Sequence, residues 1–326
     1  PGTGFTAPAA APPARIHVPP RLRRGDTVSL VTPGSFISDD SLQTAYTNLE
    51  SLGYVVKPGT NLRRRRGYTA GTVHERLDDL HTAFADPQSR AVWCARGGYG
   101  AAQLMPDLDL KLIRRANKIF IGYSDITVLL NGIHDATGLV TYHGPVGSST
   151  LTDYTRTQLQ LALETNLPLD ILPLVPGEKE TDGGFFQESL AAGRATGKLL
   201  GGNLTLLSAA VGTPYFPKVK GSLLFIEDIE ERPYRIDRML LQMSQAGVFD
   251  RVAGVVLGTF VGCSAEEDDL GSLTLPETMR DRLGKLGVPV FYGLPIGHID
   301  DMCTLPVGQP ASFDGASGRL VVKREG

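Results

Sequence analysis

The sequence predicts an α/β protein with an N-terminal open, mostly parallel sheet of the Rossmann or flavodoxin type and a second, smaller α/β domain. From Arg21 onward, apolar runs of strand length alternate with segments whose apolar residues recur at helical spacing. Strands that alternate with helices are joined by crossover connections, and this makes the strands parallel. The length of 326 residues is enough for two domains.

The elements of the first domain follow from these runs in chain order. Segment 24–35 contains a turn, a β-branched run and a Gly/Pro loop, which is typical of a first buried strand. Further strands are expected at 54–57, 91–94 and 118–121, and helices at 42–52, 75–85, 101–105 and 126–136.

The pattern weakens between about residues 150 and 192, where several prolines and an Asp-Gly-Gly turn interrupt any long element. Strands are then expected at 222–226, 254–258 and, as the final strand, 289–292, with helices at 234–246 and 276–286. We therefore expect a domain over 21–150, an inter-domain connection over 151–192 and a domain over 193–326.

The first 20 residues differ in composition from the rest of the chain. They contain six prolines and five alanines, which predicts a disordered leader over 1–20. The apolar stretches elsewhere are far shorter than the roughly 18 to 20 residues that span a bilayer, so we expect no membrane partner.

Charge and cysteine content exclude several functional classes. The 32 Lys and Arg nearly balance the 35 Asp and Glu, leaving a net charge of −3, which argues against a nucleic-acid binder. Cys94, Cys263 and Cys303 form no Cys-x-x-Cys pair, and the chain has no His-Glu-x-x-His motif. We expect neither a metal nor a cofactor.

A candidate nucleophile follows the strand expected at 118–121. Gly122-Tyr-Ser-Asp125 and the helix after it have the layout of a nucleophile elbow, which lifts the hydroxyl of Ser124 out of the sheet. The amide of Asp125 then lies at a helix N-terminus. Ile126 occupies the place of the motif's second glycine, and the alternative is that Ser124 or Asp125 only caps the helix.

Two more loops follow predicted strands, where ligands bind in open parallel sheets. The paired glycines of Ala95–Gly100 suit an oxyanion hole, although a tight structural turn is equally compatible. Glu227 directly follows four apolar residues and could orient an imidazole. Of the six histidines, His143 and His298 each follow a strand-like segment beside glycine, so both are candidate bases.

Taken together, the motifs resemble the LD-carboxypeptidase family, which comprises the muramoyl-tetrapeptide carboxypeptidases and the microcin-C self-immunity peptidases. The resemblance covers nearly everything from about residue 21 to 322. Its motifs, in order, are Arg96-Gly-Gly-Tyr-Gly100, Gly122-Tyr-Ser-Asp-Ile-Thr127, Gly201-Gly-Asn-Leu204, Glu227-Asp-Ile-Glu-Glu-Arg-Pro-Tyr-Arg-Ile-Asp-Arg238 and Gly297-His298.

The resemblance implies a serine peptidase whose triad is Ser124, Glu227 and His298, with the serine on the first domain and the other two residues on the second. It implies an oxyanion hole from the backbone amides of Gly98 and Asp125, and it makes His143 a structural or pocket-wall residue. It also implies a cofactor-free hydrolysis of an L,D-peptide bond, releasing terminal D-alanine from murein tetrapeptide, by a homodimer. The implied compartment is cytoplasmic, or periplasmic if an export signal precedes Pro1.

Two alternatives stay open at this stage. A microcin-type immunity peptidase would need an aromatic residue near the site to stack a base, but the only tryptophan, Trp93, lies in a predicted strand and the loop 260–275 is acidic. A non-catalytic α/β binding module would use Ser124 only as a helix cap. Arg96 could bind a terminal carboxylate or brace its loop through an ion pair, and the run Arg63–Arg66 is typical of a solvated turn.

Overall fold

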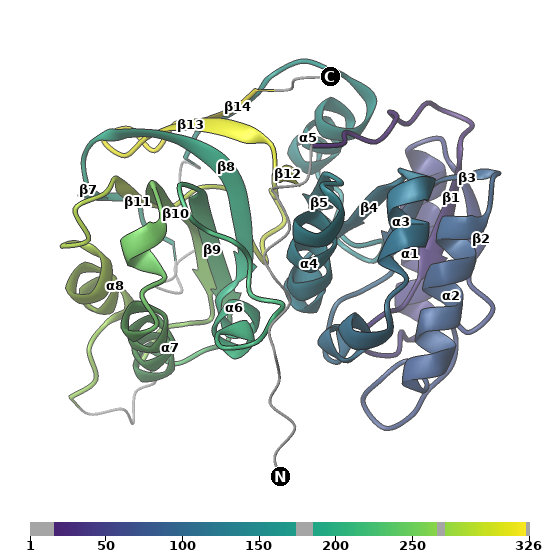
Figure 1. Ribbon diagram of the computed structural model, residues 1–326, viewed down its shortest axis with the longest axis horizontal. Helices are drawn as coiled ribbons and strands as arrows, with labels where there is room; N and C mark the ends of the chain where they lie inside the picture. Colours follow the sequence, from purple (N-terminus) through teal and green to yellow (C-terminus); the bar gives the residue numbers. More distant parts are fainter. Residues whose placement is uncertain (1–15, 174–184, 266–270, 324–326) are drawn as a thin grey trace, which may run out of the picture.

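The computed structural model describes residues 16–173, 185–265 and 271–323. These residues form two α/β halves that lie side by side, each around its own sheet (Figure 1). One sheet has six strands in the order β12-β5-β4-β3-β1-β2, and the other has eight in the order β6-β14-β13-β8-β9-β10-β11-β7. The predicted α/β class with two sheets is confirmed.

The first sheet is parallel except at one edge. Strands β5, β4, β3, β1 and β2 run parallel, and β12 joins β5 antiparallel. Its strands are β1 (Thr27–Val31), β2 (Val55–Pro58), β3 (Ser89–Cys94), β4 (Ile119–Gly122), β5 (Thr141–His143) and β12 (Leu305–Val307). The helices are α1 (Asp39–Ser51), α2 (Val73–Ala85), η1 (Ala101–Asp107), α3 (Leu110–Ala116), η2 (Ser124–Ile126) and α4 (Thr127–Thr137).

The second sheet has a parallel centre and antiparallel edges. Strands β8 to β11 run parallel, while β13, β14, β6 and β7 pair antiparallel. Its strands are β6 (Leu169–Ile171), β7 (Glu188–Ala191), β8 (Arg194–Asn203), β9 (Leu223–Ile229), β10 (Gly254–Val261), β11 (Val290–Tyr292), β13 (Pro310–Asp314) and β14 (Leu320–Val322). The helices are α6 (Leu204–Ala210), α7 (Pro233–Gln245), η3 (Phe249–Arg251) and α8 (Leu275–Leu283).

The expectation that the strand near 289–292 is the last one is wrong. Strands β12, β13 and β14 follow β11. They are three to five residues long and begin beside proline or follow glycine turns, so the sequence pattern there is typical of loops. One of them, β12, returns to the first sheet and links the two halves.

The stretch 151–192 contains more regular structure than its prolines indicate. It holds α5 (Asp153–Glu164), β6 and β7, and residues 174–184 within it lie outside the described residues. Thr152 caps α5, and the hydroxyl of Thr155 donates to the backbone oxygen of Asp300 at 2.5 Å. The helix is therefore tied to the loop that follows His298.

The predicted leader over 1–20 lies mostly outside the described residues, which begin at residue 16. Within its last part, the amide of His17 donates to the backbone oxygen of Gly138 at 2.8 Å, and the amide of Val140 donates to His17 at 2.8 Å. His17 is thus paired with the segment between α4 and β5.

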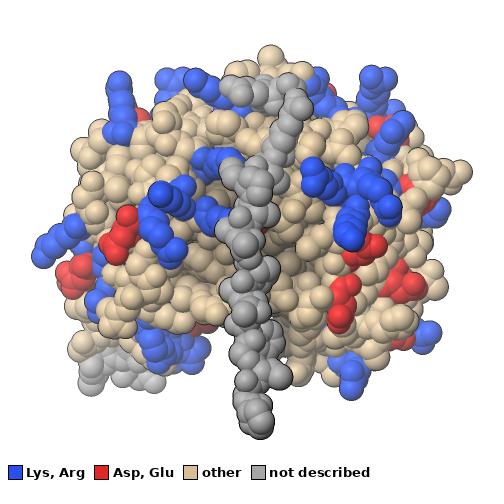
Figure 2. Space-filling model, viewed as in Figure 1, with Lys and Arg blue, Asp and Glu red and all other residues tan. Residues whose placement is uncertain are grey.

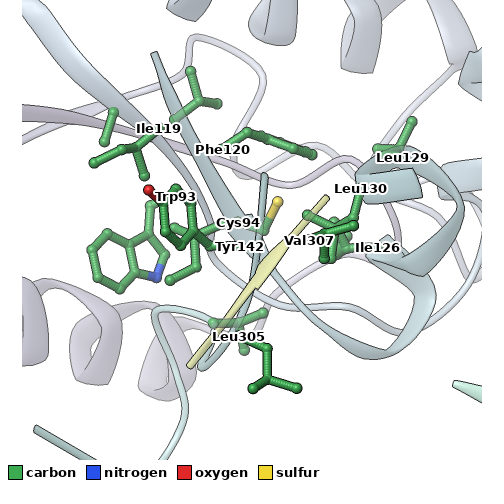
Figure 3. Packing of buried hydrophobic residues seen from close by; sticks show 14 of the residues in the cluster. Trp93, Cys94, Ile119, Phe120, Ile126, Leu129, Leu130, Tyr142, Leu305 and Val307 are labelled. Carbon is green, nitrogen blue, oxygen red and sulfur yellow. The ribbon is translucent and has the colours of Figure 1, made fainter. Parts of the chain in front are cut away.

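A shared hydrophobic core joins the two sheets. Figure 3 shows the part of this core around β3, β4 and β5, where Leu305 and Val307 of β12 pack near Tyr142. Leu223 and Phe225 of β9 belong to this shared core, whereas Leu224 and Ile226 pack into a second core with α6, α7 and α8. Because successive strand residues alternate between faces, one face of β9 is directed toward the first half.

Charged side chains of both signs are distributed over the face drawn in Figure 2, with Lys and Arg present on both halves. None of the helices in the described ranges has the length and apolar character of a transmembrane span.

Candidate active site

Ser124 lies directly after β4, at the start of the short helix η2. Its backbone φ is 63°, in the left-handed region that a serine rarely adopts. A non-glycine residue in this conformation costs on the order of 1–3 kcal/mol and tends to occur at functional sites. The strained turn between a buried strand and a helix is the geometry of the predicted nucleophile elbow.

Asp125 holds the elbow through its side chain. It is 2% exposed, and its Oδ2 accepts a hydrogen bond of 2.8 Å from the amide of Ala101, the first residue of η1. Burial raises the pKa of this carboxyl, and backbone amides and Arg76 oppose the rise. The side chain thus connects the elbow to the glycine loop after β3, while its backbone amide stays next to Ser124.

The glycine loop after β3 packs directly on the elbow. A Cβ placed on Gly97 would come within 3.0 Å of the Ser124 Cβ and 3.3 Å of the Asp125 nitrogen. Gly98 has a φ of +90°, and a Cβ there would lie 2.4 Å from the hydroxyl of Ser35. The backbone at Gly98 therefore favours glycine, and Gly97 leaves little room for a side chain, so the loop lies directly against the turn formed by Ser124 and Asp125.

Glu227 reaches the site because of its position in β9. It lies on the same face as Leu223 and Phe225, which is the face directed toward the first half. Its side chain is fully buried, and its Oε2 lies 2.8 Å from Nδ1 of His298. Its other oxygen, Oε1, is buried and has no hydrogen-bond partner within the described ranges.

His298 follows β11 and is 13% exposed. Burial lowers its pKa, but the Glu227 carboxylate and, to a smaller degree, Asp228 and Glu230 outweigh burial, so the pKa is raised above 6.5. Its ring centroid lies 4.8 Å from that of Tyr123, the neighbour of Ser124. The structure thus brings the imidazole of the second half against the elbow of the first.

The hydroxyl of Ser124 and His298 form no hydrogen bond in the described structure. Catalytic hydrogen bonds are often long in the absence of substrate and shorten when it binds.

Asp228 alternates with Glu227 and faces the opposite side of β9. Burial and the neighbouring Glu227 raise its pKa to about 6. It accepts hydrogen bonds from Asn203 Nδ2 at 2.7 Å and from the Thr205 amide at 2.9 Å. This carboxylate therefore fixes the start of α6 and adds negative charge behind His298.

The remaining histidines do not share the position of His298. His143 is fully buried between Tyr123 and Phe225, with ring centroids 6.0 and 5.0 Å away. Burial is the main cause that lowers its pKa to about 4, which keeps the ring neutral. His134 is buried and its Nδ1 lies 3.0 Å from the backbone oxygen of Leu139.

Hydrogen bonds between α4 and the end of β8 join the two halves, and we call this set of contacts the clasp. The side-chain amide of Asn131 in α4 donates to the Gly201 oxygen at 2.8 Å and accepts from the Gly201 nitrogen at 3.2 Å. The amide of Asn203 donates to the Thr127 hydroxyl at 3.1 Å. Since Asn203 pairs with Glu227 in the sheet, the clasp joins the helix that follows Ser124 to the strand that carries Glu227.

Gly202→Ala is expected to open this clasp. A Cβ at Gly202 would lie 2.5 Å from the Thr127 hydroxyl, and the backbone φ is +143°. We expect a loss of about 1–3 kcal/mol in the free energy of unfolding, measured by urea denaturation, together with reduced activity. The matched control is Gly212→Ala, where φ is +84° but nothing lies within 4 Å of the added Cβ. Equal losses for both variants would contradict the close approach.

Among the described residues, no group of three or more His, Cys, Asp or Glu side chains is arranged to hold a metal ion.

Comparison with known proteins places both halves among peptidases. Residues 28–144 match the LD-carboxypeptidase N-terminal domain, and residues 196–313 match the LD-carboxypeptidase C-terminal domain. The chain belongs to the LD-carboxypeptidase family.

Its relatives align over nearly their whole length. The chain is 39% identical to a probable murein peptide carboxypeptidase of Bacillus subtilis, over 94% of each chain. It is similar to the crystal structure of a muramoyltetrapeptide carboxypeptidase from Oxalobacter formigenes, with 30% identity, a TM-score of 0.78, and coverage of 91% and 97%. An MccF-like protein from Bacillus anthracis is 28% identical, with a TM-score of 0.83 and coverage of 94% and 99%.

Proposed function

We propose that this protein is a serine-type LD-carboxypeptidase that releases terminal D-alanine from murein tetrapeptide during peptidoglycan recycling. The single observation that carries the proposal is the contact set that joins the halves: Glu227 bonded to His298, and His298 against Tyr123, beside the strained Ser124. The relatives named as murein peptide and muramoyltetrapeptide carboxypeptidases support the substrate class.

In the proposed mechanism, Ser124 Oγ attacks the scissile carbonyl carbon while Nε2 of His298 takes its proton. The tetrahedral intermediate collapses, the bond to the D-alanine nitrogen breaks, and His298 returns the proton to that nitrogen. Water then attacks the acyl-enzyme ester with His298 again as base, which frees the shortened peptide and restores the serine.

Glu227 serves this cycle by holding the proton on Nδ1 of His298, so that Nε2 is the acceptor. Its carboxylate also stabilises the imidazolium that forms in the transition state. The same interaction between Glu227 and the protonated ring raises the pKa of His298.

The amides of Gly98 and Asp125 are the proposed oxyanion donors. The close packing of Gly97 on Ser124 supports this role, because it holds the loop that carries Gly98 against the turn formed by Ser124 and Asp125. Removal of one such donor typically costs on the order of 3 kcal/mol of transition-state stabilisation.

The microcin-type alternative has less support in the chain's aromatic residues. Trp93 is 1% exposed, and its indole nitrogen donates to the backbone oxygen of Pro145 at 2.9 Å, so it offers no surface for a base. Residues 266–270 of the acidic loop lie outside the described residues. The homodimer and the cytoplasmic location implied by the resemblance belong to the same proposal.

The test is mass analysis of L-Ala-γ-D-Glu-diaminopimelate-D-Ala before and after incubation with the purified protein. We expect loss of one alanine residue and appearance of free D-alanine. A tetrapeptide ending in L-alanine is the matched substrate control and should stay intact. Failure to cleave the D-alanine peptide, combined with cleavage of an aminoacyl-nucleotide amide, would favour the immunity peptidase instead.

A further inference from the structure

We propose that the guanidinium of Arg96, with Arg65 beside it, binds the free terminal carboxylate of the peptide substrate. The inference rests on the proposed function and names the subsite that selects a carboxypeptidase substrate. The scissile carbonyl carbon is three bonds away from the terminal carboxylate carbon. The group that recognises the carboxylate must therefore lie within one side chain's reach of the oxyanion hole.

Arg96 is carried by the glycine loop that packs on Ser124. It directly precedes Gly97, where an added Cβ would lie 3.0 Å from the Ser124 Cβ, and it lies two residues before Gly98. It is half-buried, so its charge is only partly screened by water. The loop that supplies the oxyanion donor thus carries a cation as well.

The described residues contain no carboxylate within ion-pair distance of Arg96. Its one hydrogen bond runs from Nη1 to the backbone oxygen of Phe36 at 3.0 Å. A guanidinium has five N–H donors, so this bond orients the group and leaves other donors for a ligand. An ion pair that merely braces the loop, the alternative that the sequence leaves open, is absent from the described structure.

A second arginine, Arg65, contacts Phe36, the residue to which Arg96 is hydrogen-bonded. The Cζ of Arg65 is 4.0 Å from the ring centroid of Phe36, and Arg65 likewise has no carboxylate partner among the described residues. Its neighbours in the run are different, since Arg63 pairs with Asp39 and Arg64 pairs with Glu75. Of the four arginines in the run, Arg63 and Arg64 are thus paired with carboxylates, whereas Arg65 joins Arg96 at Phe36.

The segment carrying Phe36 is fixed to the oxyanion loop. The amide of Ser35 donates to the Gly97 oxygen at 3.1 Å, and the hydroxyl of Ser35 accepts from the Tyr99 amide at 3.0 Å. The segment that carries Phe36, to which Arg96 is hydrogen-bonded, is thus held against the loop of Gly98, as a subsite for a carboxylate requires.

Arg76, another arginine near the elbow, uses its guanidinium for hydrogen bonds within the protein. Arg76 is 3% exposed, its Nη1 donates to the oxygens of Pro33 and Gly100, and its Nη2 donates to Gln103. Because these bonds occupy the guanidinium, Arg76 is not the carboxylate partner. Arg96 is the nearby cation with donors still available.

The experiment compares the tetrapeptide with its C-terminal amide, which lacks the negative charge, on wild type and Arg96→Gln. We expect wild type to cleave the acid at least tenfold better than the amide. Arg96→Gln should lower kcat/KM for the acid on the order of 10- to 100-fold and leave the amide nearly unchanged. Arg96→Lys, which keeps the charge without the planar fork, should recover part of the preference for the acid.

Arg64→Gln is the matched control, because it removes the same charge from an exposed arginine that already has a carboxylate partner. This variant should lower the kcat/KM for the acid and for the amide by no more than about twofold. Equal losses of acid and amide cleavage in Arg96→Gln would show a bracing role and overturn the subsite. Equal cleavage of both substrates by wild type would overturn it without any variant, while leaving the carboxypeptidase function standing.

Discussion

Ser124→Ala is expected to lower kcat/KM for D-alanine release by about ten thousand- to a million-fold. The substitution removes the only atom that forms the proposed acyl-enzyme, and loss of a triad nucleophile in other hydrolases has effects of this size. The measurement is free D-alanine formed from tetrapeptide under single-turnover conditions. Alanine at this position keeps the strained φ of 63°, so stability should change little.

The control is Ser148→Ala, the same change on the loop after β5. It should leave the rate within about twofold. A fluorophosphonate probe should label wild type and Ser148→Ala but not Ser124→Ala. Undiminished D-alanine release by Ser124→Ala would end the assignment of this serine as nucleophile and favour the binding-module interpretation.

The first half of the molecule could be predicted well from sequence because its strands and helices are local patterns. The runs before Gly122 and Gly98 mark strand ends, and strand ends of a parallel sheet are where the site lies. Glu227 could be singled out because a carboxylate at the end of four apolar residues is costly to bury without a partner. His298 is that partner at 2.8 Å.

The contacts that unite the site could not be derived from local sequence patterns, because they depend on tertiary structure. The choice between His143 and His298 could not be made from their local sequence, since both follow strand-like segments beside glycine. Burial of one beneath Tyr123 and contact of the other with Glu227 distinguish them. Likewise Asn131 appears as an ordinary helix residue, and only the approach of β8 to α4 gives its amide two partners.

The short strand β12 illustrates the same limit. Three residues containing proline carry no strand signal of their own, and their pairing with β5 depends on a partner more than 150 residues earlier in the chain. The sequence therefore predicts two separate domains, where the structure has a strand from the end of the chain completing the first sheet.

Glu227→Gln is expected to lower kcat on the order of ten thousand-fold while leaving the protein at least as stable as wild type. In the proposed mechanism, the Glu227 carboxylate fixes the tautomer of His298 and stabilises the imidazolium, which a neutral amide cannot do. The equivalent change in a well-studied serine protease has an effect of this size. Glu227 is fully buried, and its Oε1 has no partner in the described ranges, so removing the charge also removes a desolvation cost. The activity should thus fall, while the free energy of unfolding measured by urea denaturation should stay the same or rise.

The pH profile separates this role from a merely structural one. The base must be neutral, so activity is lost as pH falls through the pKa of His298, which lies above 6.5 in wild type. In Glu227→Gln the carboxylate that raises this pKa is gone while burial, which lowers it, persists. The acid limb of kcat/KM should therefore move to lower pH, even though the charges of Asp228 and Glu230 still raise the pKa of the imidazole.

Glu231→Gln provides the comparison, because it removes a carboxylate four residues further on that pairs with Arg235. Its acid limb should coincide with that of wild type. The pKa of Asp228 also falls when the Glu227 charge is removed, because Glu227 contributes to raising it to about 6, so Asp228 stays charged to lower pH and opposes part of the shift. An unchanged or higher limb in Glu227→Gln would mean that the carboxylate does not act through His298, and the pair would then be a structural contact between β9 and the loop after β11.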